Sequence, residues 1–257
     1  MISTVSNPNS TLMSKKIGLI GAMPQELQAV VDLIDQPKQS QKSNRTYYEG
    51  TLHGQSVVAV FSRSGKVAAT ITVCSLILDY GVDEIIFIGV AGGVDRSLHI
   101  GDVVIAKRLI QHDVDPRPVM PQYEIPLLGV TYFESDEERS KVAFDSATDF
   151  VENRLPPALM ERFHIRKPRV VYGDIASGDK FFSNESEVLA LGEALPTVSC
   201  VEMEGAAVAQ ACYEFGIPFT VIRTISDGAD EHADVNFLEF ANNVANLYGA
   251  AIIEGMF

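Results

Sequence analysis

The sequence predicts a single α/β domain with three layers, in which helices cover both faces of a mixed, mostly parallel central sheet. Short apolar runs rich in β-branched residues alternate with segments of helical periodicity from residue 16 to the C-terminus. The 257 residues suffice to bury a full core, and 46% hydrophobic with 21% charged residues is typical of globular domains. No repeat, linker or domain boundary interrupts the alternation.

The elements follow from local patterns. Strands are expected at 16–22, 45–52, 56–62, 84–90, 102–106, 170–175, 198–203 and 218–225. Helices are expected from Pro24 onward and at 65–80, 136–155, 205–215 and 236–255. His53-Gly54 between two alternating runs indicates a hairpin, which makes the sheet mixed. Gly81 is the expected C-cap of the second helix.

One segment stands apart from this alternation. Residues 111–131 are proline-rich and show no periodicity. A loop this long in a compact domain is usually functional or a subunit contact.

Composition excludes several classes of partner. The net charge of -14 argues against nucleic acid and anionic membranes, because nothing would offset the phosphate field. No apolar run approaches the ~18 residues that span a bilayer. The first thirteen residues lack a basic start and an apolar stretch, so we expect residues 1–14 to be a disordered extension or to precede a start near Met13, and not a secretory signal. Residues 15–257 would form the catalytic domain.

Three cysteines, Cys74, Cys200 and Cys212, lie in apolar patterns without C-x-x-C spacing. Reduced, buried thiols of a cytoplasmic protein are the favoured interpretation.

Carboxylates gather at the ends of expected strands. The run Val201-Glu202-Met203-Glu204-Gly205 ends one strand, and Arg223-Thr224-Ile225-Ser226-Asp227 ends the next. Glu26 follows the first strand. Ligands of α/β proteins bind at strand ends, and burying an unpaired carboxylate there costs several kcal/mol. These residues predict an enzyme that acts on a sugar-like ligand by acid/base chemistry.

Each acid has an ordinary alternative role. Glu26 lies in the first turn of a helix, which favours the ionised carboxylate that a general base needs, but acids are common there in any case. Asp227 could cap a loop or, if its surroundings raise its pKa, donate a proton.

Arg223 and the two glutamates need partners. Strand alternation places Arg223 on the face of Ile225 and Asp227, so Asp227, Glu26 or a bound water is its expected partner. Glu202 and Glu204 are expected to share one strand face. Either could hold the vicinal hydroxyls of a ribose, and the other would then form a structural ion pair.

Two further groups have competing interpretations. Phe181 and Phe182 are core residues or, in a loop, a stacking surface for a planar base. The glycines at 89, 92 and 93 match neither G-x-x-x-x-G-K-[ST] nor G-x-G-x-x-G, so a close approach of backbone to ligand is favoured.

A metal site is not favoured. His112, Asp113 and Asp115 could suggest one, but no second cluster complements them, and a loop network fits better.

Six ordered motifs resemble those of the 5′-methylthioadenosine/S-adenosylhomocysteine nucleosidases, which share the α/β fold of the nucleoside phosphorylase superfamily. The resemblance runs from about Lys16 to the C-terminus. The motifs are Gly21-Ala22-Met23-x-x-Glu26, Gly65-Lys66-Val67, Ala91-Gly92-Gly93, Ser177-Gly178-Asp179, Val201-Glu202-Met203-Glu204 and Ile225-Ser226-Asp227.

The resemblance implies a role for each matching residue. Glu26 would activate the water that attacks the anomeric carbon, with Arg223 helping to place it. Asp227, held by Ser226, would protonate adenine N7, and Glu204 would hold the ribose hydroxyls. The substrate pocket would be completed by Met23, Ser64, Gly92, Phe181, Phe182 and Met203, with Phe181 stacked on adenine, the Phe182 backbone at its edge and Met203 beneath the sugar.

Departures from the family pattern bear on the reaction. The superfamily's phosphorylases bind phosphate with the Arg of an R-V-G-S pattern, where this chain has Phe87-Ile88-Gly89-Val90. The nucleosidases usually have Asn-x-Gly-Ser there, so Val90 is also atypical. Without that cation, hydrolysis is favoured over phosphorolysis.

A second departure concerns the 5′-substituent. Ser62-Arg63-Ser64-Gly65 replaces a usual Ser-Gly-Ile-Gly, which puts Ser64 where an apolar residue is expected and adds a cation at Arg63. Arg117, in the loop that the family exchanges across its dimer, is another unexpected cation. Both arginines either pair with surface acids or serve a charged 5′-tail.

The resemblance therefore implies a cytoplasmic homodimeric hydrolase that acts on a small-molecule nucleoside, with no metal and no organic cofactor. A hydrolase of aminofutalosine or futalosine, a phosphorylase using Arg63 or Arg117, and a catalytically inactive nucleoside-binding module are the rivals.

Overall fold

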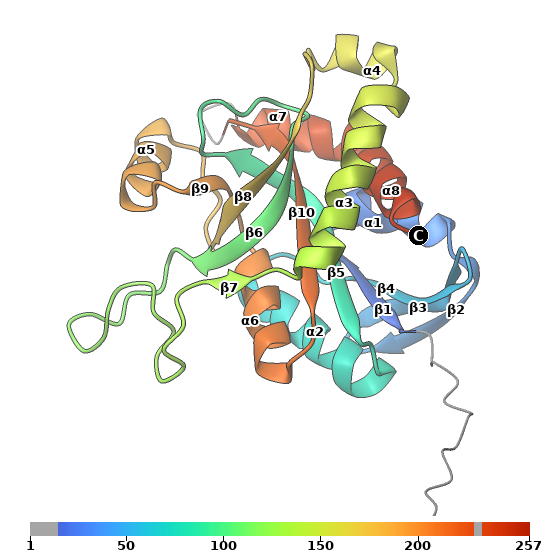
Figure 1. Cartoon of the computed structure of the whole chain (residues 1–257), viewed down its shortest axis with the longest axis horizontal. Coiled ribbons are helices and arrows are strands. Elements are labelled where there is room, and N and C mark those ends of the chain that lie inside the picture. The colour runs from blue at the N-terminus through green and yellow to red at the C-terminus, as the bar shows by residue number, and fades with distance from the viewer. Residues whose placement is uncertain (1–14, 229–232) are drawn as a thin grey trace, which may run out of the picture.

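The protein folds around a mixed sheet flanked by helices, in a computed structural model that describes residues 15–228 and 233–257 (Figure 1). The extension expected at residues 1–14 lies outside the described residues. The strands are β1 Ile17–Gly21, β2 Asp35–Lys42, β3 Arg45–Leu52, β4 Gln55–Phe61, β5 Glu84–Gly93, β6 Val103–Gln111, β7 Phe133–Glu134, β8 Val170–Ser177, β9 Val198–Glu202 and β10 Phe219–Asp227. The helices are α1 Pro24–Asp32, α2 Lys66–Tyr80, α3 Glu137–Asp149, α4 Pro157–Arg162, α5 Glu185–Ala194, α6 Gly205–Phe215, α7 Ala233–Phe240 and α8 Asn246–Gly255, with π-helical turns η1 Phe150–Arg154 and η2 Ala241–Ala245.

Five strands of the sheet, β5, β10, β6, β8 and β9, pair in a closed ring. Parallel pairs join β4, β1, β5 and β10 on one side and β6, β8 and β9 on the other. Antiparallel pairs of β10 with β6 and of β5 with β9 complete a ring. Gly92 of β5 consequently pairs with Asp227 of β10 and with Val201 of β9. The ring thus brings the carboxyl ends of three strands together.

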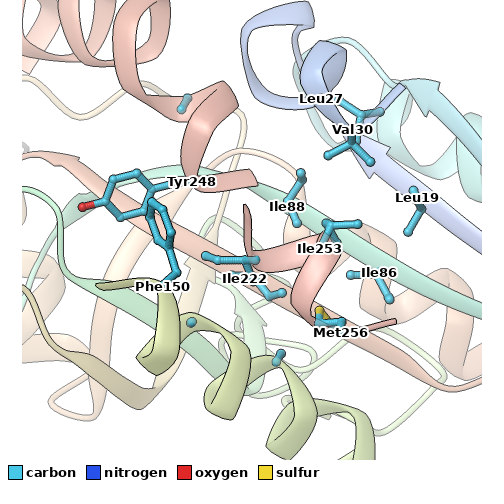
Figure 2. Close-up of a cluster of buried hydrophobic side chains, with 14 of the residues drawn as sticks. Leu19, Leu27, Val30, Ile86, Ile88, Phe150, Ile222, Tyr248, Ile253 and Met256 are labelled. Carbon is cyan, nitrogen blue, oxygen red and sulfur yellow. The ribbon is translucent and has the colours of Figure 1, made fainter. Parts of the chain in front are cut away.

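Helices bury both faces of the sheet, as the sequence predicts. On one face, α1, α3 and α8 cover a cluster that includes Leu27, Ile86, Ile222 and Ile253, shown in Figure 2. On the other, α2 and α6 pack together over a second cluster. In the described part of the chain, no helix is long and apolar enough to cross a membrane.

The expected elements are confirmed. The hairpin turn at His53-Gly54 has φ of 47° and 83°, and Gly81 is the left-handed C-cap of α2. The sequence analysis missed β2, β7, α4 and α5. In β2 every residue is polar except Pro37, and the strand pairs only with β3 at the sheet edge, so no apolar alternation marks it.

The predicted long loop is confirmed. Between β6 and β7 the chain makes only an isolated bridge of Ile125 with Val130, and Figure 1 shows this segment extending away from the sheet. Val119 and Leu127 in it are 86% and 98% exposed.

Candidate active site

A cavity opens where β1, β5, β9 and β10 end. About 560 Å³ of space in and around it is not filled by protein atoms, counting the part open to solvent. Ten of the predicted residues line it, namely Met23, Glu26, Ser64, Gly92, Phe181, Phe182, Met203, Glu204, Ser226 and Asp227. Arg223, Arg63 and Arg117 do not line it.

Glu26 is a buried carboxylate held by backbone donors. Its Oε2 accepts a hydrogen bond from the Met23 N–H at 2.9 Å, and its Oε1 accepts one from the Val90 N–H at 3.1 Å. Burial raises the pKa of Glu26, although Arg223 and the backbone donors oppose the rise. The helix terminus was expected to favour the ionised form of Glu26. That expectation is wrong, because the effect of burial on the pKa is larger than that of the nearby donors and of Arg223. The higher pKa makes Glu26 a stronger base.

Gly89 makes room for this carboxylate. A Cβ atom at residue 89 would lie 2.7 Å from Glu26 Oε1 and 3.2 Å from Arg223 Nη1. Gly89 therefore leaves room for the Glu26 and Arg223 side chains and does not line the cavity, nor does Gly93, whereas Gly92 lines it as expected.

Glu204 lies at another part of the cavity wall. It precedes α6, and its Oε1 accepts a hydrogen bond from the Gly65 N–H at 2.7 Å. Burial, reinforced by Glu202, raises the pKa of Glu204 to about 8. This carboxyl therefore holds its proton more tightly than an ordinary glutamate does.

Glu202 forms the structural ion pair. Its Oε2 is 2.7 Å from Arg223 Nη2, and both side chains are buried. Glu202 also accepts hydrogen bonds from the Ser177 hydroxyl and from the backbone N–H groups of Glu204 and Gly205. Glu202 was not among the expected partners of Arg223, whereas Glu26 was, and the charges of Glu26 and Arg223 do interact. β10 has a bulge between Ile225 and Asp227, so the strand alternation does not extend to Asp227. The shared strand face was wrong, since β9 ends at Glu202.

Arg223 lies behind the cavity. Its side chain is 1% exposed, and its guanidinium stacks 4.0 Å from the centre of the Phe87 ring. Its influence on the cavity passes through the charge of Glu26 and the ion pair with Glu202. It is thus a positioning residue in this geometry.

Asp227 is the last residue of β10 and is 3% exposed. The Ser226 hydroxyl donates a hydrogen bond to Asp227 Oδ2 at 2.6 Å. That bond fixes the orientation of the carboxyl at the cavity wall.

Aromatic rings form another wall. Phe181 is 43% exposed and meets Phe237 of α7 edge-on, with centroids 5.6 Å apart. Phe182 is more buried and packs edge-on against His112. The sequence analysis missed Phe237, because its spacing in the last helix is that of a core residue.

The remaining polar candidates are explained by local pairs. Arg117 forms an ion pair with Asp115 at 2.5 Å, and Asp113 forms one with Lys66 at 2.6 Å. The loop network is thereby confirmed. Residues 15–228 and 233–257 contain no group of three metal-ligating side chains. Arg63 forms no ion pair with any described residue.

Comparisons with known proteins agree with this geometry. The chain matches the model of the phosphorylase superfamily over residues 16–256. It is 34% identical over 239 residues to the 5′-methylthioadenosine/S-adenosylhomocysteine nucleosidase of Haemophilus influenzae (strain PittEE), covering 93% of this chain and 97% of the relative. It is equally 34% identical over 234 residues to the aminodeoxyfutalosine nucleosidase of Helicobacter pylori (strain J99 / ATCC 700824), covering 90% and 94%.

A solved structure extends the likeness to three dimensions. The 5′-methylthioadenosine/S-adenosylhomocysteine nucleosidase of Neisseria meningitidis, in complex with methylthio-immucillin-A, superposes with a TM-score of 0.84 at 32% identity, covering 94% of this chain and 98% of that one. The strand-end cavity thus lies in a fold shared over nearly the whole length, and the chain belongs to the phosphorylase superfamily.

Proposed function

We propose that this protein is an N-ribosyl hydrolase that releases adenine from 5′-methylthioadenosine and S-adenosylhomocysteine. The observation that carries the proposal is the convergence of Glu26, Glu204 and Asp227, from distant parts of the chain, on one cavity. The relatives named as nucleosidases support the same substrates.

The proposed reaction uses these acids in sequence. Glu26 takes a proton from water as the water oxygen bonds to the anomeric carbon. The bond from that carbon to adenine N9 breaks, and Asp227 gives its proton to adenine N7, so that the base leaves neutral. Glu204 holds the ribose hydroxyls. The transition state is oxocarbenium-like, as in inverting glycoside hydrolysis.

The charge of the cavity favours water over phosphate as the nucleophile. Four carboxyl groups line it, on Glu26, Glu202, Glu204 and Asp227. Among the described lining residues, the sole basic side chain is that of Lys180, which pairs with Glu187 at 2.8 Å. A phosphate dianion would therefore find no unpaired cation among the described lining residues to offset its charge.

A homodimer is part of the proposal. Exposed apolar side chains gather on the adjoining helices α2 and α6, with Val67 71%, Leu78 69% and Tyr213 52% exposed. The extended loop between β6 and β7 exposes more. A second copy of the chain would cover both surfaces, and sedimentation equilibrium should give twice the monomer mass.

We also place the enzyme in the cytoplasm. Cys200 and Cys212 are unpaired, and burial raises the pKa of both thiols, in keeping with a reducing compartment.

Chromatographic detection of adenine tests the proposal. Both nucleosides should yield adenine at rates that do not change when phosphate is added. A rate that requires phosphate would instead identify a phosphorylase. Aminodeoxyfutalosine is the second candidate substrate, favoured by the Helicobacter pylori relative, and a much higher kcat/KM for it would displace the first.

A further inference from the structure

A second, open pocket adjoins the nucleoside cavity. Ser64 lines both, and the second pocket is also lined by Arg63 and Asp179. Because Glu204 bonds to the Gly65 N–H, this junction lies at the end of the cavity where the proposed function puts the ribose. If Ser64 lies against the substituent on the ribose 5′-carbon, as expected from the sequence, that substituent would extend toward the second pocket.

Arg63 is an uncommitted cation in an unfavourable backbone conformation. Its φ is 69°, in the left-handed region that side chains other than glycine rarely adopt. Within the described structure its side chain makes one hydrogen bond, from Nη2 to the Asn44 carbonyl at 2.6 Å. Strain of this kind is retained at functional sites when the side chain serves a purpose there.

Two other arginines show what a structural role looks like. The guanidinium of Arg45 is buried and donates to the carbonyls of Ser43, Ser62 and Ala68. Arg117 is paired with Asp115. Arg63 has neither arrangement, so the interpretation that both unexpected arginines pair with acids holds for Arg117 alone.

Asp179 supplies the opposite charge. Its Oδ1 accepts a hydrogen bond from the Lys66 N–H at 2.8 Å, and its own N–H donates to Asp113 Oδ2. These bonds fix the carboxylate at the start of α2. Asp179 is exposed, and it forms no ion pair with any described residue. A cation and an anion, neither of them in an ion pair within the described structure, thus line the same pocket.

We infer that Arg63 and Asp179 form a subsite for the α-amino acid at the end of a long 5′-thio substituent. Arg63 receives the carboxylate and Asp179 receives the ammonium group. This inference rests on the proposed function and deepens it. It assigns the polar loop 62–65 to the selection of adenosylhomocysteine over methylthioadenosine.

Steady-state kinetics of the full-length enzyme on both nucleosides test the subsite. Arg63→Gln removes the charge and keeps the Cβ atom, and we expect it to lower kcat/KM for adenosylhomocysteine about 3- to 10-fold while leaving methylthioadenosine unchanged. Arg63→Lys, which keeps the charge, should restore part of the loss. The matched control Arg96→Gln removes an exposed arginine that pairs with Glu185 elsewhere and should change neither value.

Two substrate analogues separate the halves of the subsite. An analogue without the amino group should be insensitive to Asp179→Asn, and an analogue without the carboxylate should be insensitive to Arg63→Gln. An unchanged ratio of the two kcat/KM values in both variants would overturn the subsite but not the hydrolase.

Dissociation constants measured by calorimetry test the subsite even if the protein cleaves neither nucleoside. If the wild type cleaves neither nucleoside, the ratio of their dissociation constants in Arg63→Gln still reports on the subsite. Failure to bind either nucleoside would overturn both proposals.

Discussion

Two charged pairs beside the nucleoside cavity differ in burial and pairing. We call the buried Glu202–Arg223 pair the floor, and Arg63 and Asp179 of the adjoining open pocket the rim. At the floor, Glu202 and Arg223 are buried, paired and surrounded by donors. At the rim, Arg63 and Asp179 are exposed and form no ion pair within the described structure. Burial makes each floor contact costly to lose, whereas water screens the rim. The floor is therefore suited to holding the reacting groups in place, and the rim to the binding of a charged substituent that we propose.

The largest effect is expected at the acids themselves. Glu26→Gln and Asp227→Asn should each lower kcat by about 10²–10⁴-fold, because each removes one proton transfer. Adenine release measured beside thermal unfolding checks this. Near-normal rates in either variant, with an unchanged melting temperature, would remove that residue from the mechanism.

The next effect tests the floor as a paired unit. Glu202→Leu leaves the Arg223 charge buried and unpaired, which costs about 3–5 kcal/mol and should lower the melting temperature by about 10 °C. The double variant Glu202→Leu/Arg223→Met removes both charges and should recover most of the stability. Its kcat should remain low, because Glu26 has lost the nearby charge of Arg223 and the Glu204 N–H has lost its hydrogen bond to Glu202.

Recovery of activity together with stability in that double variant would contradict the positioning role. It would show that the ion pair serves the fold alone.

A smaller effect concerns pH. The pKa of Glu204 is about 8 in the folded protein, above its ordinary value of 4.5, so the folded state holds a proton that the unfolded state releases between these values. Stability of the empty enzyme should consequently be highest at low pH within this window and fall as pH rises toward 8. Glu204→Gln should flatten this decline in urea unfolding. An equally steep decline in the variant would contradict the assignment.

The smallest effect concerns the rim. Arg63→Gly should be more stable than Arg63→Ala by about 1 kcal/mol, because glycine alone accepts the left-handed conformation without strain. Equal urea midpoints would mean that φ at residue 63 relaxes freely.

The sequence predicted the position of the carboxylates but not their partners. Glu26, Glu204 and Asp227 could be placed at strand ends, since apolar runs mark the strands that carry them. The Glu202–Arg223 pair could not, because a bulge in β10 and the end of β9 break the alternation from which side-chain faces are inferred.

Two other failures have the same origin in tertiary structure. The polar strand β2 forms through its backbone pairing with β3, which its own sequence does not indicate. Phe237 lines the cavity because of the way α7 packs. Burial around Glu26, which reverses the expected direction of its pKa, likewise depends on segments remote in sequence. The division of the chain into an extension and one catalytic domain stays a prediction.

The most direct test of the account is the fate of oxygen at the anomeric carbon. The enzyme is supplied with methylthioadenosine in water enriched in oxygen-18, with phosphate present, and the sugar product is examined by mass spectrometry at early times. Attack by water activated by Glu26 predicts one heavy oxygen in the free 5-methylthioribose and no sugar phosphate. A 5-methylthioribose 1-phosphate product would contradict the account.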